Sequence, residues 1–129
     1  MNQTRPMTIT GWVLSGLFIA FMIFDVGIKL AQLSIVAETN VSLGFAADAG
    51  LKIGVIEAIC LVLYVIPQTA TLGAILLTAV MGGAIATHLR LESPLFSHQL
   101  FGVYLGLMLW GGLWLRDERL RAMIPVRRS

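Results

Sequence analysis

The chain contains few charged residues and almost no cysteine, and each shortage excludes a class of function. Charged side chains make up 12% of the 129 residues, whereas about 25% is usual in a soluble domain. Apolar residues make up 57%, which predicts an integral membrane protein. Cys60 is the only cysteine, so one chain cannot form a disulfide, a CxxC redox pair or a cysteine-based metal site. The net charge of +2 is too small to indicate a nucleic-acid partner.

Four apolar runs are each long enough for a membrane-spanning helix, since about 20 helical residues cross the roughly 30 Å of hydrocarbon in a bilayer. We predict an all-α membrane protein, a bundle of four transmembrane helices that forms one domain over residues 1–129. The predicted spans are about 9–33, 47–66, 69–88 and 97–115. The longest connection, from Ser34 to about Gly50, mixes polar and apolar residues, so we expect it to pack on the end of the bundle.

Basic residues at the two ends of the predicted bundle differ in number, which predicts its orientation. One end carries Arg5, Arg116, Arg119, Arg121, Arg127 and Arg128, and the other carries Lys29, Lys52 and Arg90. The arginine-rich end also contains both termini, so we predict that both termini are cytoplasmic. Four aromatic residues fall near the same end and fit an aromatic belt: Trp12, Tyr64, Trp110 and Trp114.

Ionisable residues from all four predicted spans converge at the opposite, outer end, and the inner half is left without charge. An ionised group in lipid costs at least about 2.5–3.5 kcal/mol, so these side chains must face one another or a wet cavity. The candidate catalytic or anchoring residues are Asp25, Glu57, His88 and Arg90. The candidate ligand-binding residues are Lys29, Lys52, Thr87, His98, Gln99 and Tyr104. Apolar walls are expected from Phe21, Met22, Phe101 and Tyr104.

A purely structural interpretation competes for the same residues. Asp25 and Lys29 are four positions apart, as are Asp48 and Lys52, so each pair can form a local ion pair on its own helix. Glu57 has no basic residue three or four positions away, so it needs a partner from another helix or must stay protonated. Imidazole and carboxylate groups suit several metals. The spacing of the two histidines is not specific for one, and we predict no metal site.

Small residues recur at four-residue spacing in the second half of the chain: Ala79, Gly83 and Thr87; Gly82 and Ala86; Gly102 and Gly106. Such spacing lets helix backbones approach closely in lipid. We therefore expect the third and fourth spans to pack tightly, either within one chain or between two. The predicted partners are therefore the lipid bilayer, from the apolar composition, and a second copy or a larger membrane complex, from the small-residue spacing.

Several motifs resemble the DoxX-like family of small four-helix membrane proteins. They are Tyr64-x-Ile66-Pro67-x-Thr69, Leu72-Gly73-Ala74-x-Leu76-Leu77-Thr78, Gly82-Gly83-Ala84-x-Ala86-Thr87-His88-x-Arg90, Pro94-Leu95-Phe96 and the run from Leu109 to Arg121. Gln68 stands where relatives are expected to have arginine. The wider DoxX group includes a membrane subunit associated with thiosulfate:quinone oxidoreductase, redox-complex accessory proteins and an animal receptor-assembly chaperone. The resemblance therefore implies a four-helix fold more firmly than a reaction.

Three functions are compatible with the sequence. The first is a site for a small lipophilic molecule, with quinone as one candidate ligand, or a role as a redox-complex accessory subunit. The second is an acid–base enzyme, an isomerase or hydrolase, acting on a lipophilic substrate through Asp25 or Glu57. The third is an assembly or scaffold protein docked through its small residues. The sequence requires no cofactor, and we expect the chain in the bacterial cytoplasmic (inner) membrane. A transporter fits less well, because the charges gather at one end instead of the midplane.

Overall fold

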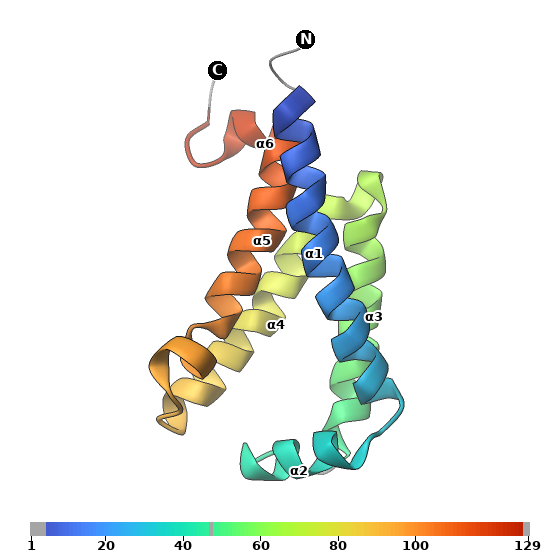
Figure 1. Ribbon diagram of the computed structural model, residues 1–129, viewed down its shortest axis with the longest axis vertical. Coiled ribbons are helices and arrows are strands. Elements are labelled where there is room, and N and C mark those ends of the chain that lie inside the picture. Colours follow the sequence, from blue (N-terminus) through green and yellow to red (C-terminus); the bar gives the residue numbers. More distant parts are fainter. Residues whose placement is uncertain (1–4, 47, 128–129) are drawn as a thin grey trace.

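The computed structural model describes residues 5–46 and 48–127 and folds them almost entirely into helices (Figure 1). The elements are α1 (Arg5–Leu30), α2 (Ser34–Ser42), α3 (Ala49–Val65), the 3-10 turn η1 (Pro67–Thr69), α4 (Ala70–Arg90), the π-helical turn η2 (Leu95–Gln99), α5 (Phe101–Arg116) and α6 (Glu118–Met123). Neither of the two described ranges contains a strand, so the predicted all-α fold is confirmed. The predicted start of the second span at 47 and the predicted cytoplasmic Arg128 lie outside the described residues.

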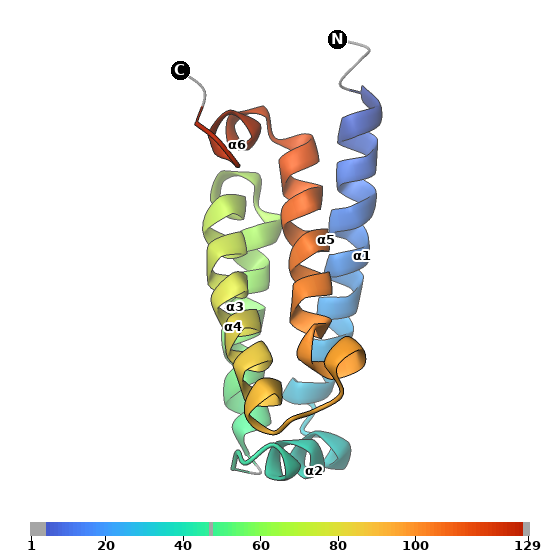
Figure 2. The ribbon, with the colours of Figure 1, turned by 90° about the vertical axis from the view of Figure 1, so that its left-hand side faces the viewer.

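The four long helices form a bundle in which α1 packs against α5 and α3, and α4 packs against the same two helices. α1 and α4 therefore lie across the diagonal of the bundle. Both termini lie at one end, which we call the termini end, and α2 crosses the other, which we call the α2 end (Figures 1 and 2). As expected, the long connection packs on the bundle end, because α2 lies against α3.

Proline and aspartate set the helix boundaries near the termini end. Ile66 is extended, with φ −78° and ψ 120°, because proline at the next position disfavours helical backbone, and α3 ends there. Asp117 is also extended and begins α6, where its Oδ1 accepts hydrogen bonds from the backbone N–H groups of Arg119 and Leu120 at 3.0 and 3.3 Å. These two breaks turn the chain back at the same end of the bundle.

Two helical stretches, Arg5–Leu30 and Pro67–Arg90, are long and apolar enough to cross a membrane. α3 and α5 are shorter, with 17 and 16 residues. α1 differs from its predicted span by several residues at both ends, and α5 begins several residues later than predicted. Large apolar side chains point away from the bundle on all four helices, among them Leu17, Phe24, Ile59, Ile75 and Leu107. Such an apolar outer surface is suited to lipid.

The buried core is concentrated on the facing sides of the four helices, and its largest fully buried side chains are Tyr64, Phe18, Leu77, Leu109 and Leu113. The Phe18 and Tyr64 rings meet edge to face, with centroids 5.5 Å apart. Tyr64 therefore does not belong to an aromatic belt, and that prediction is wrong for this residue. Its apolar ring and its hydroxyl both find partners inside the bundle.

Glycines allow the closest helix contacts, and most of these glycines are not the ones that the four-residue spacing predicts. A Cβ on Gly112 would lie 2.8 Å from the carbonyl oxygen of Gly11, where α1 meets α5. A Cβ on Gly73 would lie 2.7 Å from the Cα of Tyr64, where α4 meets α3. Gly82, Gly83 and Gly106 have open space instead. Within one chain, these three glycines therefore make no close contact, whereas Gly102 packs against Ile85. The alternative contact between two chains stays a prediction.

Candidate functional site

A pocket of about 240 Å³ lies in the half of the bundle nearer α2, between α1 and α3 on one side and α4, η2 and α5 on the other. The helices diverge toward this end (Figure 1). Its lining is mostly apolar and includes Phe21, Met22, Leu77, Val80, Met81, Ala84, Phe101, Gly102 and Leu105. Its polar lining consists of Asp25, Lys29, Glu57, His88 and His98. Mixed apolar walls with a few convergent polar groups are typical of ligand sites.

Lys29 joins the two carboxylates of the pocket. Its Nζ donates to Asp25 Oδ2 at 2.7 Å, one helical turn away, and to Glu57 Oε1 on α3 at 2.5 Å. The Glu57 side chain is only 3% exposed, whereas those of Lys29 and Asp25 are 21% and 25% exposed. The local Asp25–Lys29 pair and a partner for Glu57 from another helix, both considered from the sequence, therefore occur together, and Lys29 belongs to both. An ammonium group has three N–H donors, so one remains for a further acceptor.

The two histidines lie at the other side of the pocket mouth. Their rings meet edge to face with centroids 5.5 Å apart. His88 Nδ1 is 3.0 Å from Ser93 Oγ, and His98 Nδ1 is 2.7 Å from Ser97 Oγ. The Nδ1 atoms are thus engaged with hydroxyl groups. Over residues 5–46 and 48–127, no group of three or more His, Cys, Asp or Glu side chains could hold a metal ion.

The other candidate residues of the outer end do not line this pocket. Lys52 is exposed on α3. Arg90 donates to the carbonyl oxygen of Leu43 at 3.3 Å, and so ties the end of α4 to the segment after α2. Thr87, Gln99 and Tyr104 donate to backbone carbonyl oxygens of Gly83, Ser93 and Phe96. These contacts hold the ends of the helices and the η2 turn in place.

A second polar cluster, missed from the sequence, lies inside the bundle toward the termini end. The Tyr64 hydroxyl donates to the carbonyl oxygen of Leu109 at 2.7 Å and lies 2.8 Å from Ser15 Oγ. Arg116 Nε donates to the same Ser15 Oγ at 3.2 Å, and its guanidinium stacks 4.0 Å from the Trp12 ring centroid. The prediction that the inner half contains no charge is therefore wrong at Arg116. Gly11 and Ser15 are four positions apart, a small-residue spacing that could have indicated this close contact.

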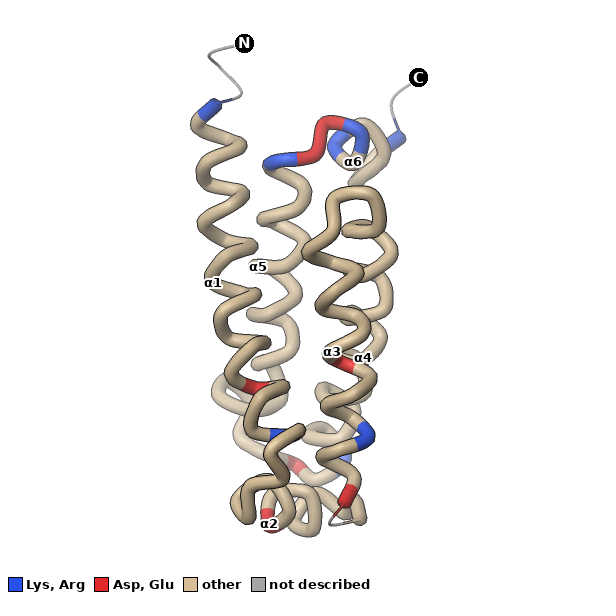
Figure 3. Tube along the Cα trace, turned by 90° about the vertical axis from the view of Figure 1, so that its right-hand side faces the viewer, with Lys and Arg blue, Asp and Glu red and all other residues tan. Residues whose placement is uncertain are grey.

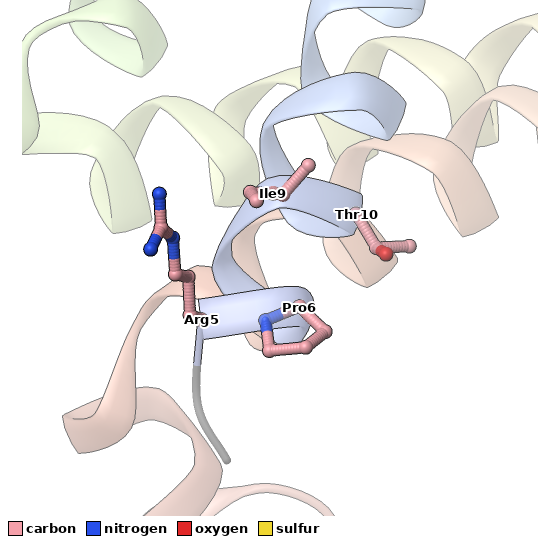
Figure 4. A pocket seen from close by; sticks show the side chains of 4 residues that line it. All are labelled: Arg5, Pro6, Ile9 and Thr10. Carbon is pink, nitrogen blue, oxygen red and sulfur yellow. The ribbon is translucent and has the colours of Figure 1, made fainter. Parts of the chain in front are cut away.

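The termini end carries a larger hollow, but it is not a candidate site. This hollow of about 480 Å³ is lined by Arg5, Pro6, Ile9 and Thr10. Figure 4 shows that all four side chains come from the first turns of α1. Residues of one helix cannot enclose a ligand, so the pocket near α2 remains the candidate site.

The helical bundle has an apolar outer surface, and a pocket near one end gathers a few charged and polar side chains; these features are those of a helical membrane protein. A sequence profile of the DoxX-like family matches residues 13–112. The chain therefore belongs to the DoxX-like family, which confirms the resemblance inferred from the motifs. None of the curated proteins and none of the solved structures compared with the chain matches it. Family membership thus establishes the fold of the chain but no reaction.

Proposed function

We propose that the pocket near α2 binds the head group of a small lipophilic ligand, and that a quinone-like molecule is one such ligand. The observation that carries this proposal is the pocket itself, in which Asp25, Lys29 and Glu57 meet apolar walls. Its volume of about 240 Å³ is below the range of about 300–1,000 Å³ usual for drug-sized ligands. The pocket therefore suits a head group, while an apolar tail would extend into the surrounding lipid.

The polar groups favour a ligand that accepts hydrogen bonds. Lys29 has one N–H donor left after its bonds to Asp25 and Glu57. A ring carbonyl, as in a quinone, can accept this bond while its ring packs against Phe21 and Phe101, whose centroids are 5.3 Å apart. The same contacts favour binding over acid–base catalysis, because one oxygen of each carboxylate is already engaged by the Lys29 ammonium group.

The membrane arrangement that goes with this proposal has four spans and cytoplasmic termini, in the bacterial inner membrane. α3 and α5 would then cross beside the two longer helices against which they pack, and the pocket would face the outside. Because Cys60 is buried, an impermeant maleimide should label the natural chain very little. Ser97→Cys should be labelled from outside and Glu118→Cys only after the membrane is broken. Labelling in the reverse order would overturn this orientation.

Binding is tested with a pair of matched variants on α4. Ala79 and Ala84 are both exposed on α4, but Ala84 lines the pocket and Ala79 does not. In nanodiscs, calorimetric titration with a short-chain quinone should show binding to the natural chain and to Ala79→Phe. Ala84→Phe should raise the Kd at least about tenfold, because the ring fills the pocket and displaces ligand contacts. If the natural chain binds no quinone, a quinone-like molecule is not the ligand. If Ala84→Phe binds the quinone as tightly as the natural chain, the ligand does not bind in this pocket.

A role in assembly is a second candidate, and one observation favours it. The Gly82, Gly83 and Gly106 positions have open space instead of a neighbour within the chain. In lipid, such small residues allow close contact with a helix of another chain, so a homodimer or a larger redox complex could form there. Gly83→Leu should then reduce the oligomer seen after crosslinking in the membrane, while Ala84→Phe should leave it intact. An unchanged oligomer in Gly83→Leu contradicts this role.

A further inference from the structure

Both ends of the bundle carry charges of both signs (Figure 3), but in the described residues carboxylates outnumber basic residues at the α2 end and arginines outnumber carboxylates at the termini end. In the described residues, the termini end has five arginines, Arg5, Arg116, Arg119, Arg121 and Arg127, against the two carboxylates Asp117 and Glu118. Asp117 is engaged as the cap of α6. The ion pairs of residues 5–46 and 48–127 are those of Lys29, at the other end. The positive charge of the termini end is therefore not neutralised by ion pairs of these residues.

Two of these arginines serve the fold and three are exposed. Arg116 bonds Ser15, and Arg121 Nη1 donates to the last carbonyl oxygens of α5, those of Trp114 and Leu115, at 2.9 and 2.8 Å. Arg5, Arg119 and Arg127 are exposed. An exposed guanidinium is a planar donor that suits phosphate oxygens.

An apolar groove adjoins this arginine-rich surface. It has a volume of about 450 Å³ and is lined by Trp110, Gly111, Trp114, Leu115 and Ile124. Trp114 Nε1 donates to the carbonyl oxygen of Ile124 at 2.8 Å, which holds the segment after α6 beside α5. Met123 and Val126 in the same segment are largely exposed. Tryptophan, exposed apolar residues and arginine together are typical of the level of lipid head groups.

From this combination we infer that the termini end binds an anionic phospholipid, with its phosphate at the exposed arginines and an acyl chain in the groove beside Trp114. Charge complementarity favours an anionic head group, and the apolar lining of the groove favours a lipid over a soluble anion. This site is independent of the pocket near α2, because the two share no residue. Its failure would leave the proposed function standing.

The tryptophans make the test direct, because all three in the chain belong to the termini end: Trp12, Trp110 and Trp114. The full chain is reconstituted in phosphatidylcholine vesicles that contain a small, equal fraction of brominated phosphatidylglycerol or brominated phosphatidylcholine. Bromine quenches tryptophan fluorescence only at close contact, so the ratio of the two quenching effects measures the lipid preference at this end. We expect stronger quenching by brominated phosphatidylglycerol.

Two pairs of variants separate the charge from the groove. Arg119→Gln with Arg127→Gln should reduce the preference by up to about fivefold per arginine, the factor that corresponds to about 1 kcal/mol per basic residue near an anionic surface. Lys52→Gln with Arg90→Gln removes the same charge at the other end and should leave the preference unchanged. Gly111→Leu fills the groove and should also reduce the preference. Gly27→Leu, in open space on α1 at the other end, should not.

The inference is overturned if the natural chain is quenched equally by the two brominated lipids. It is equally overturned if the arginine variants keep the full preference, because the phosphate contacts would then be absent. If Gly111→Leu keeps the full preference while the arginine variants lose it, the lipid is held only by surface charge. The proposal that an acyl chain binds in the groove would then be wrong.

Discussion

The same four helices are closed at the termini end and open at the α2 end. Toward the termini, α1 and α5 approach so closely that a Cβ on Gly112 would lie 2.7 Å from the backbone nitrogen of Ser15. Ser15, Tyr64 and Arg116 then join the helices by hydrogen bonds. Toward α2 the helices diverge (Figure 1), and the charged side chains line a pocket of about 240 Å³ between them.

This difference follows from what each residue type can do in lipid. Helices in a bilayer gain little from burying apolar surface, so close packing of small residues holds them together. Charged side chains are too large for such contacts and too costly to face lipid, so they require either partners or a cavity. Glycine and serine therefore close one end, and Asp25, Lys29 and Glu57 accompany the opening at the other.

The largest expected effect comes from removing the cation of the open end. Lys29→Met leaves the carboxylate of Glu57 buried without an opposite charge. Removing one partner of a buried pair costs about 3–5 kcal/mol, and the partial exposure of Lys29 and Asp25 places the expected loss near the lower value. The thermal unfolding of the purified protein in detergent should show a clearly lower Tm.

A neutral triple variant is the control for this effect. Asp25→Asn, Lys29→Met and Glu57→Gln together remove all three charges and should recover most of the Tm, because no unpaired charge remains. Quinone binding should stay lost in the triple variant, since the Lys29 donor is gone. A single Lys29→Met variant that unfolds at the Tm of the natural chain would show that the ion pairs contribute nothing to the fold.

A smaller loss is expected when one methyl group is added at the closed end. Gly73→Ala places a Cβ against the backbone of Leu63 and Tyr64, where no side chain can move aside, and overpacking of this kind costs about 1–3 kcal/mol. Gly82→Ala makes the same change on the same helix in open space and should leave the Tm unchanged or raise it. Equal Tm values for the two variants would mean that α3 and α4 are not in close contact at Gly73.

A still smaller effect is expected from the buried hydroxyl of the closed end. Tyr64→Phe keeps the edge-to-face contact with Phe18 but removes the hydrogen bonds to Leu109 and Ser15. One buried hydrogen bond contributes about 1 kcal/mol net. We expect a modest fall in Tm that is not additive with Ser15→Ala, because both changes break the same contact. If the two losses in Tm are fully additive, the hydroxyl groups of Ser15 and Tyr64 do not contribute through a shared hydrogen bond.

The gathering of ionisable residues at the open end was predictable from the sequence, whereas which of them line the pocket and the contacts of the closed end were not. Counting residues along helices was enough to bring Asp25, Glu57 and His88 toward one another, because ionisable groups stand out in an apolar run. Ser15 and Tyr64 did not stand out, since a hydroxyl is compatible with a helix in lipid and gives no sign of its partner. The four-residue spacing that includes Gly82 and Gly83 left open whether they contact the same chain or another one, because such spacing defines a helix face but not what that face contacts.

The smallest effect on the Tm is expected at Lys52, which lies at the open end and has the same spacing from an aspartate as Lys29. Each follows an aspartate by four positions, but Lys29 bonds two carboxylates inside the bundle, whereas Lys52 is exposed on α3. Surface substitutions usually change stability by no more than about 0.5 kcal/mol. Lys52→Gln should therefore leave both the Tm in detergent and quinone binding in nanodiscs at natural values. A loss of quinone binding in Lys52→Gln would extend the site beyond the pocket to the outer surface of α3.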